Sequence, residues 1–134
     1  MPIWQAPHVR KERIEMARYR LIAFTDPVAG KDQDYNDWYN NVHLADVVAI
    51  PGFISAQRFV LKAATAGEIR NRYVAIYEME TDDPMALMAE IGHRAGTERM
   101  LVSTALDTES ENSGIFEPCS DIVYAAEPLP ALPR

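Results

Sequence analysis

Strand-like and helix-like segments alternate along this chain in an order that few folds accommodate. Segments rich in β-branched and aromatic residues predict strands over 18–25, 54–61, 72–79 and 121–126. Helical periodicity predicts helices over 34–50 and from 84 to about 95, the second capped by Asp83 with Pro84 in its first turn. The order β-α-β-β-α-β is typical of the ferredoxin-like fold, an α+β architecture with a four-stranded antiparallel sheet and two helices on one face.

The remaining segments have weaker patterns. Residues 1–16 are expected to be an N-terminal arm, 17–127 the domain and 128–134 a proline-rich C-terminal tail. Residues 97–106 are expected to extend the second helix or to start another. The acidic stretch 109–113 is expected to be a loop.

Both faces of the predicted sheet carry apolar side chains. In the segment 54–61, Ala56 and Val60 alternate with Phe59 and Leu61, and the segment 72–79 is similarly apolar on both faces. Two helices can cover only one face, so the other face requires a different cover. We therefore expect a homodimer in which the sheet faces of two copies pack together.

Composition excludes several classes of partner and cofactor. The net charge is −7, from 13 basic and 20 acidic residues without a basic stripe, so nucleic acid is not expected as a partner. No apolar run approaches the roughly 20 residues of a membrane span, and the acidic balance disfavours an anionic membrane surface. The single cysteine, Cys119, excludes an intrachain disulfide and a thiolate metal cluster. We expect a cytoplasmic protein.

Sequence motifs give no sign of a cofactor. The chain has no glycine-rich phosphate loop, no HExxH zinc motif and no GxSxG nucleophile elbow. We therefore expect chemistry without a metal or cofactor.

The helix predicted over 34–50 contains the strongest catalytic candidates. On a regular α-helical wheel, Asp46 lies within the apolar stripe near Tyr39, and His43 lies at the edge of that stripe. A carboxylate there requires a partner, so Asp46 would orient His43 and favour its charged form. His43 is then a candidate general acid or base, and Tyr39 a hydrogen-bond donor to a developing oxyanion. The alternative is that the stripe is ordinary core and that Asp46 is a structural acceptor.

Five further residues are candidates for contact with a substrate: Trp38, Tyr35, Arg58, Tyr73 and Tyr77. Tyr73 and Tyr77 share one face of a predicted strand, where they either line a pocket or pack the core. Arg58 suits a substrate carboxylate, and the alternatives are an ion pair with Glu78 or a contact between subunits.

The segment Trp38–Phe59 carries a recognisable pattern, WY-x-x-x-HL-x-DV-x-x-IPGF-x-SAQRF. It resembles EthD-like members of the dimeric α/β-barrel superfamily. This resemblance implies two ferredoxin-like subunits that pack their sheets into a barrel, each with a pocket between its sheet and its helices. It also implies that His43 is the natural catalytic candidate.

Three functions are compatible with these features. The first is a small cofactor-independent enzyme of isomerase, cyclase or lyase type, which uses His43 on an apolar, aromatic or lactone-like metabolite. The second is a cofactor-free or haem-linked monooxygenase. The third is a non-catalytic dimeric protein that binds a small-molecule ligand or serves a degradative pathway as an accessory subunit.

Overall fold

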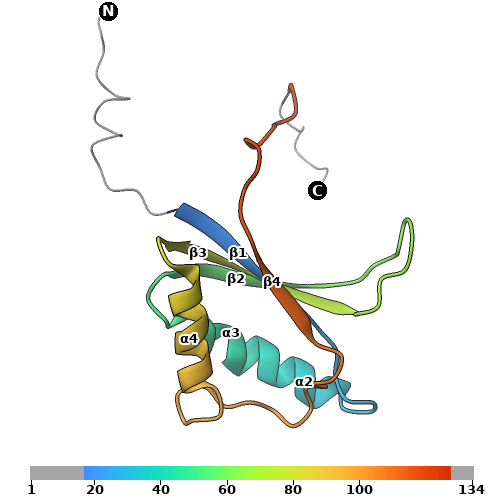
Figure 1. Ribbon diagram of the computed structural model, residues 1–134. Helices are drawn as coiled ribbons and strands as arrows, with labels where there is room; N and C mark the ends of the chain where they lie inside the picture. The colour runs from blue at the N-terminus through green and yellow to red at the C-terminus, as the bar shows by residue number, and fades with distance from the viewer. Residues whose placement is uncertain (1–16, 128–134) are drawn as a thin grey trace, which may run out of the picture.

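The computed structural model describes residues 17–127, which form an α+β domain around one antiparallel sheet (Figure 1). The sheet contains the strands β1 (Ala17–Thr25), β2 (Phe53–Val60), β3 (Tyr73–Thr81) and β4 (Asn112–Phe116), in the order β2-β3-β1-β4. This topology is compatible with the predicted ferredoxin-like fold. The predicted arm 1–16 and tail 128–134 lie outside the described residues.

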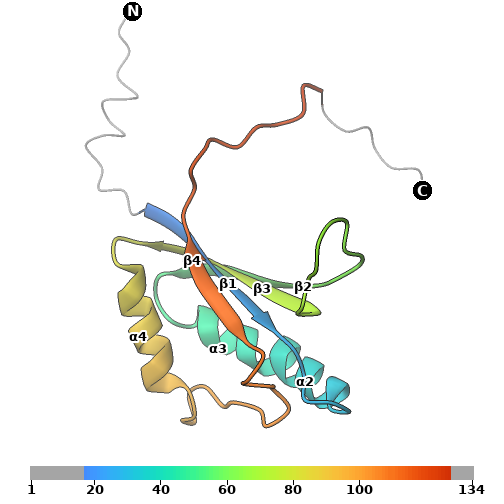
Figure 2. The same ribbon diagram turned by 45° about the vertical axis from the view of Figure 1, so that its right-hand side comes forward.

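The helices lie against one face of the sheet. The first helical segment runs without a break through α2 (Asp32–Trp38), the π-helical turn η1 (Tyr39–His43) and α3 (Leu44–Val48), and the second is α4 (Pro84–Arg94). Figures 1 and 2 show both segments on the same side of the sheet. Asp83 accepts a hydrogen bond from the backbone N–H of Ala86 at 3.2 Å, which confirms the predicted cap. No helix within residues 17–127 is long and apolar enough to cross a membrane.

The π-helical turn η1 changes which side chains of the first helix are buried. A π turn holds one residue more than an α turn, so later side chains are rotated by about 100° relative to a regular α-helix. Tyr35, Tyr39 and Val47 are therefore the buried residues, at 0, 3 and 2% exposure, and Asp46 is only partly buried. The prediction that Asp46 lies within the apolar stripe is wrong for this reason.

The core lies between the helices and the sheet. Its most completely buried side chains are Tyr35, Tyr77, Met79, Met100 and Val47. Gly52, at φ +109°, connects the first helical segment to β2 where a Cβ atom would lie 2.9 Å from a methyl carbon of Leu87. The close approach of this turn to α4 thus depends on a residue without a side chain.

The last strand lies earlier in the chain than predicted. β4 occupies 112–116, which overlaps the expected loop 109–113, while 121–126 forms no strand. The sequence of β4, NSGIF, has weak strand propensity, but the strand pairs with β1 from Arg20↔Phe116 to Phe24↔Asn112. Pairing with a neighbouring strand therefore outweighs local preference here.

The segment 97–106 is a loop and not the expected helix. Gly96, at φ +86°, follows the end of α4 in a conformation that does not continue a helix. Met100 and Ala105, at 0 and 3% exposure, then anchor the loop in the core. The carbonyl of Ala105 also accepts a hydrogen bond from the backbone N–H of Val28 at 2.7 Å. The two buried side chains and this hydrogen bond hold the loop against the rest of the domain.

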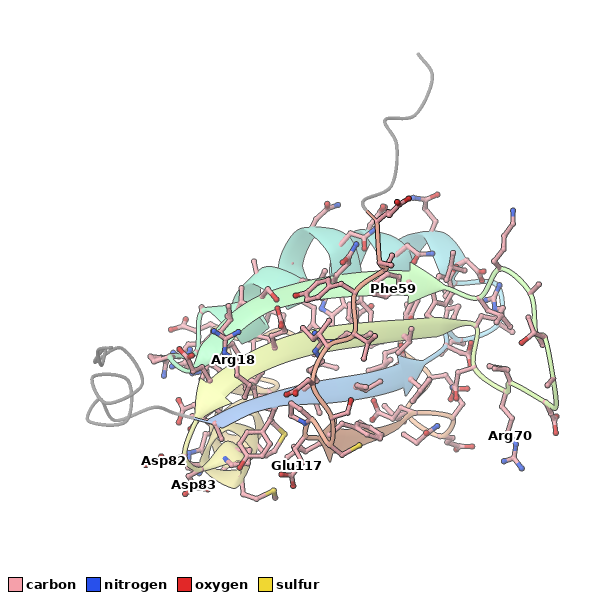
Figure 3. The ribbon with its side chains drawn as sticks, turned by 90° about the horizontal axis from the view of Figure 1, so that it is seen from above. Arg18, Phe59, Arg70, Asp82, Asp83 and Glu117 are labelled. Carbon is pink, nitrogen blue, oxygen red and sulfur yellow. The ribbon has the colours of Figure 1, made fainter. Side chains whose placement is uncertain are left out.

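The face of the sheet without helices has a charged end and an apolar end. The charged end carries two ion pairs, Arg18–Glu80 at 3.0 Å and Arg20–Glu78 at 3.5 Å. The apolar end carries Phe24 and Phe59, and Phe59 is 45% exposed. Figure 3 looks down on this face, with Arg18 toward one end and Phe59 toward the other. Part of an apolar surface is therefore open to solvent in a single copy.

Candidate functional site

Within the described residues, a hollow lies against each face of the sheet. The hollow on the helix side has a volume of about 280 Å³ and is bounded by β1, β3, the first helical segment, α4 and the chain from 95 to 113. The hollow on the open face measures about 570 Å³ and lies between the sheet and residues 116–122. Two charged residues of this larger hollow, Arg20 and Glu78, already pair with each other. The smaller cavity instead contains His43 and Tyr39, so it is the candidate site.

His43 lies in η1, with its ring packed between two aromatic neighbours. The ring stacks on that of Trp38, with 4.5 Å between centroids and 24° between planes, and it meets the edge of Tyr39 at 5.1 Å. Trp38 and His43 are five residues apart, about 140° around a regular α-helix, and the wider π turn brings them together. The stack is therefore a product of the irregular turn.

Burial keeps the imidazole uncharged. It lowers the pKa of His43 to about 4, because an imidazolium ion is poorly solvated there. Its Nδ1 atom is buried and has no hydrogen-bond partner in the described part of the chain. At neutral pH this ring is thus an uncharged imidazole and not a cation.

Asp46 does not pair with His43 as expected. Within residues 17–127 no hydrogen bond joins the two side chains, and burial alone accounts for the shifted pKa of the histidine. The predicted effect, a carboxylate that favours the charged imidazole, is wrong in direction because the pKa falls. The rotation caused by η1 explains why the carboxylate lies elsewhere.

Tyrosine hydroxyls occupy the sheet side of the cavity. Burial raises the pKa of both Tyr39 and Tyr77, which interact with each other and line the cavity. The hydroxyl of Thr25, which also lines the cavity, lies 2.5 Å from that of Tyr35, and burial also raises the pKa of Tyr35. These phenols therefore stay protonated at neutral pH and can donate hydrogen bonds.

Arg58 lies behind the cavity and does not line it. Its guanidinium carbon stands 4.3 Å from the ring centroid of Tyr39, 4.9 Å from that of Tyr73 and 5.1 Å from that of Tyr35. One nitrogen, Nη1, donates to Oδ1 of Asn40 at 2.7 Å, while Nε and Nη2 are buried without a hydrogen-bond partner in the described residues. Arg58 thus supports the aromatic cluster from its far side.

The alternative ion pair between Arg58 and Glu78 is wrong. Glu78 pairs with Arg20 and accepts a hydrogen bond from Ser55 at 2.8 Å on the open face. In the register of β2 and β3, Ser55 lies opposite Glu78 and Arg58 lies opposite Ala75. Arg58 comes three positions after Ser55, and successive side chains of a strand alternate, so the two side chains point to opposite faces of the sheet.

The cavity brings together half of the residues selected from the sequence. Trp38, Tyr39, His43 and Tyr77 line it, and the indole N–H of Trp38 donates to the carbonyl of Leu101 at 2.9 Å. The other four selected residues do not line it: Tyr35, Asp46, Arg58 and Tyr73. These four residues thus form an aromatic wall from α2, η1 and β3.

The polar rim of the cavity was missed at the sequence level. Thr108, Glu111 and Asn112 line the cavity, and the last two belong to the stretch 109–113 that the sequence identified only as an acidic loop. Burial raises the pKa of Glu111, and the charge of Asp107 raises it further. The sequence alone does not show which cavity an acidic residue in a loop will line.

Neither metal sites nor known relatives add to this description. Among residues 17–127, no group of three or more His, Cys, Asp or Glu side chains is arranged to hold a metal ion. Comparison of the chain with protein-family models, with curated proteins and with solved structures finds no match in any of the three.

Proposed function

We propose that this protein is a small cofactor-independent enzyme of the isomerase, cyclase or lyase type that moves a proton on an apolar, aromatic or lactone-like carbonyl compound. A carbon–hydrogen bond next to the carbonyl would break, its proton would pass to His43, and the electron pair would move to the carbonyl oxygen. Tyr39 would donate a hydrogen bond to that oxygen. Return of the proton to the same or another carbon, or loss of a leaving group, completes the reaction.

The observation that carries this proposal is that an uncharged imidazole and a protonated phenol line the same cavity. His43 is uncharged and can accept a proton, while the neighbouring phenol of Tyr39 keeps its proton. A positioned base contributes about 10²–10⁴-fold to a proton transfer, and one oxyanion donor contributes about 10²–10³-fold. A cavity of about 280 Å³ suits a compact ligand of one or two rings.

Deuterium exchange provides a test that does not require the natural substrate. Acetophenone and 2-tetralone carry protons next to a carbonyl, and their replacement by deuterium in D₂O is followed by ¹H NMR. The wild-type protein should accelerate exchange of at least one of these probes. His43→Phe, which keeps an aromatic ring beside Trp38, should lose about 10²-fold or more of that acceleration.

A second histidine supplies the control for this test. The side chain of His93 on α4 is 80% exposed and does not line the cavity, so His93→Phe should keep the wild-type rate. Exchange that survives in His43→Phe would contradict the proposal. Binding of the ketones without any exchange would instead favour the alternative of a non-catalytic ligand-binding protein.

We also propose that two copies associate through the open faces of their sheets, as the resemblance to the dimeric α/β barrels implies. The exposed apolar side chains on this side support the proposal, with Phe59 on the sheet and Ile122 to Tyr124 in the segment that projects beyond it (Figure 2). Phe59→Lys should convert a dimer to a monomer in sedimentation velocity. Met85→Lys, at a 63% exposed position on the helix side, should leave the dimer intact. A wild-type protein that sediments as a monomer would contradict the proposal.

A cytoplasmic location is part of the same proposal. Cys119 is an exposed free thiol, which suits a reducing compartment. Fractionation of cells that produce the tagged full chain would test it, and recovery outside the cytoplasmic fraction would contradict it.

A further inference from the structure

The described residues that line the cavity include a carboxylic acid but no lysine or arginine. The ionisable side chains among its lining residues are His43, Tyr39, Tyr77 and Glu111, and no lysine or arginine in the described part of the chain lines it. The imidazole is uncharged and the phenols keep their protons. Glu111 is therefore the acidic side chain of the described wall, and any formal charge that it carries is negative.

The partly buried cation Arg58 is separated from the cavity. The guanidinium of Arg58 lies over the ring of Tyr39, which separates it from the cavity, and Asn40 holds one of its nitrogens. Enzymes that bind carboxylates or phosphates usually present an arginine or lysine to the ligand. Among the described residues this cavity presents no cationic donor; the side-chain donors of its lining are neutral hydroxyl, amide and ring N–H groups.

Glu111 is held at the rim by a fixed backbone. Asn71, only 8% exposed, donates to the carbonyl of Ser110 at 3.0 Å and accepts from the side chain of Asn112 at 3.1 Å. These contacts fix both chain neighbours of Glu111. Its own carboxylate forms no side-chain hydrogen bond or ion pair with residues 17–127, so its acceptor atoms are free to meet a donor on a ligand.

We infer that Glu111 makes the cavity selective for an uncharged ligand that carries a hydroxyl group, such as a phenol, and selects against ligands that carry a carboxylate. The hydroxyl donates to Glu111 at the rim. The apolar remainder of the ligand packs against Trp38 and the aromatic wall. This inference rests on the proposed function, since it assigns a substrate class to the same cavity.

Three ketones that differ in one substituent test the inference by isothermal titration calorimetry near neutral pH. They are acetophenone, 4-hydroxyacetophenone and 4-acetylbenzoate. We expect 4-hydroxyacetophenone to bind at least about tenfold more tightly than 4-acetylbenzoate, with acetophenone between them. In Glu111→Gln, the ratio between the hydroxyl and carboxylate compounds should fall below about threefold.

The matched control removes a carboxylate from the same stretch of chain. Glu109 is exposed and does not line the cavity, so Glu109→Gln should keep the wild-type ratio. Equal or tighter binding of 4-acetylbenzoate by the wild type would overturn the inference, and so would an unchanged ratio in Glu111→Gln. Failure of the proposed function has a different signature, which is deuterium exchange that persists in His43→Phe or that the wild type does not accelerate.

Discussion

Lowering the pH should destabilise this protein through His43. In the folded protein, burial lowers the pKa of this imidazole to about 4, while in the unfolded chain it is near the ordinary value of 6.5. Between these two values the unfolded chain binds a proton that the folded protein does not. The stabilisation is therefore fully present above pH 6.5 and is lost progressively as the pH falls toward 4.

The size of the effect follows from the two pKa values. The difference corresponds to a loss of about 2 kcal/mol at pH 5 and about 3 kcal/mol well below pH 4. Many domains have a total stability of only about 5–15 kcal/mol, so this loss is measurable. Carboxylates also titrate in this range, which means that His43 must be separated from them by a matched variant.

His43→Phe supplies that variant. It keeps an aromatic ring against Trp38 but has no group that titrates. Urea denaturation is followed by tryptophan fluorescence at pH 7.5, 6 and 5 and at one protein concentration, so that association does not change the comparison. The wild type should lose about 2 kcal/mol more than the variant between pH 7.5 and pH 5. Parallel profiles, within about 0.5 kcal/mol, would refute the reasoning that burial keeps this ring uncharged.

Three further substitutions test the packing around the site and within α4. Gly52→Ala should lower the free energy of unfolding by about 1–3 kcal/mol, because φ is +109° and the new Cβ would contact α4, whereas Gly92→Ala, in open space within α4, should raise it by about 0.5–1 kcal/mol. Arg58→Lys should lower it by about 1–2 kcal/mol, since an ammonium group cannot both reach Asn40 and stack over three tyrosine rings. Urea denaturation measures all three changes, and a fully stable Arg58→Lys would argue against the stacked cation.

The elements with strong local signals were predictable from the sequence. The strand 18–25 and the capped helix after Asp83 combine residue preference with a clear start or end, and the structure confirms both. The strand β4 was not predictable because Asn112, Ser113 and Gly114 have low strand propensity. Its position depends on the exposed edge of β1, which is a property of the assembled sheet. The last strand was predicted over 121–126 because that run has the local pattern of a strand. Local pattern alone does not show which segment will pair with β1.

The candidate site was predictable only on its helix and strand side. Trp38, Tyr39, His43 and Tyr77 lie on regular or nearly regular elements, so residue type and spacing suggested them. Glu111 reaches the cavity because contacts with a distant asparagine position its loop, and no local pattern encodes that. Asp46 was misplaced because a helical wheel assumes one angle per residue throughout a helix.

The wide turn at Tyr39–His43 makes the site depend on how many residues the helix contains. Removal of a single residue from this turn would leave a uniform α-helix, in which each backbone N–H bonds to the carbonyl four residues earlier. Trp38 and His43 would then lie four residues apart, about 40° around a regular α-helix, so their rings would still share one face. If the turn instead straightened into α-helix with all its residues kept, the later half of the helix would rotate by about 100°, and His43 would move away from Trp38. The extra residue and the wide turn thus compensate each other, and the position of His43 depends on the two being kept or lost together.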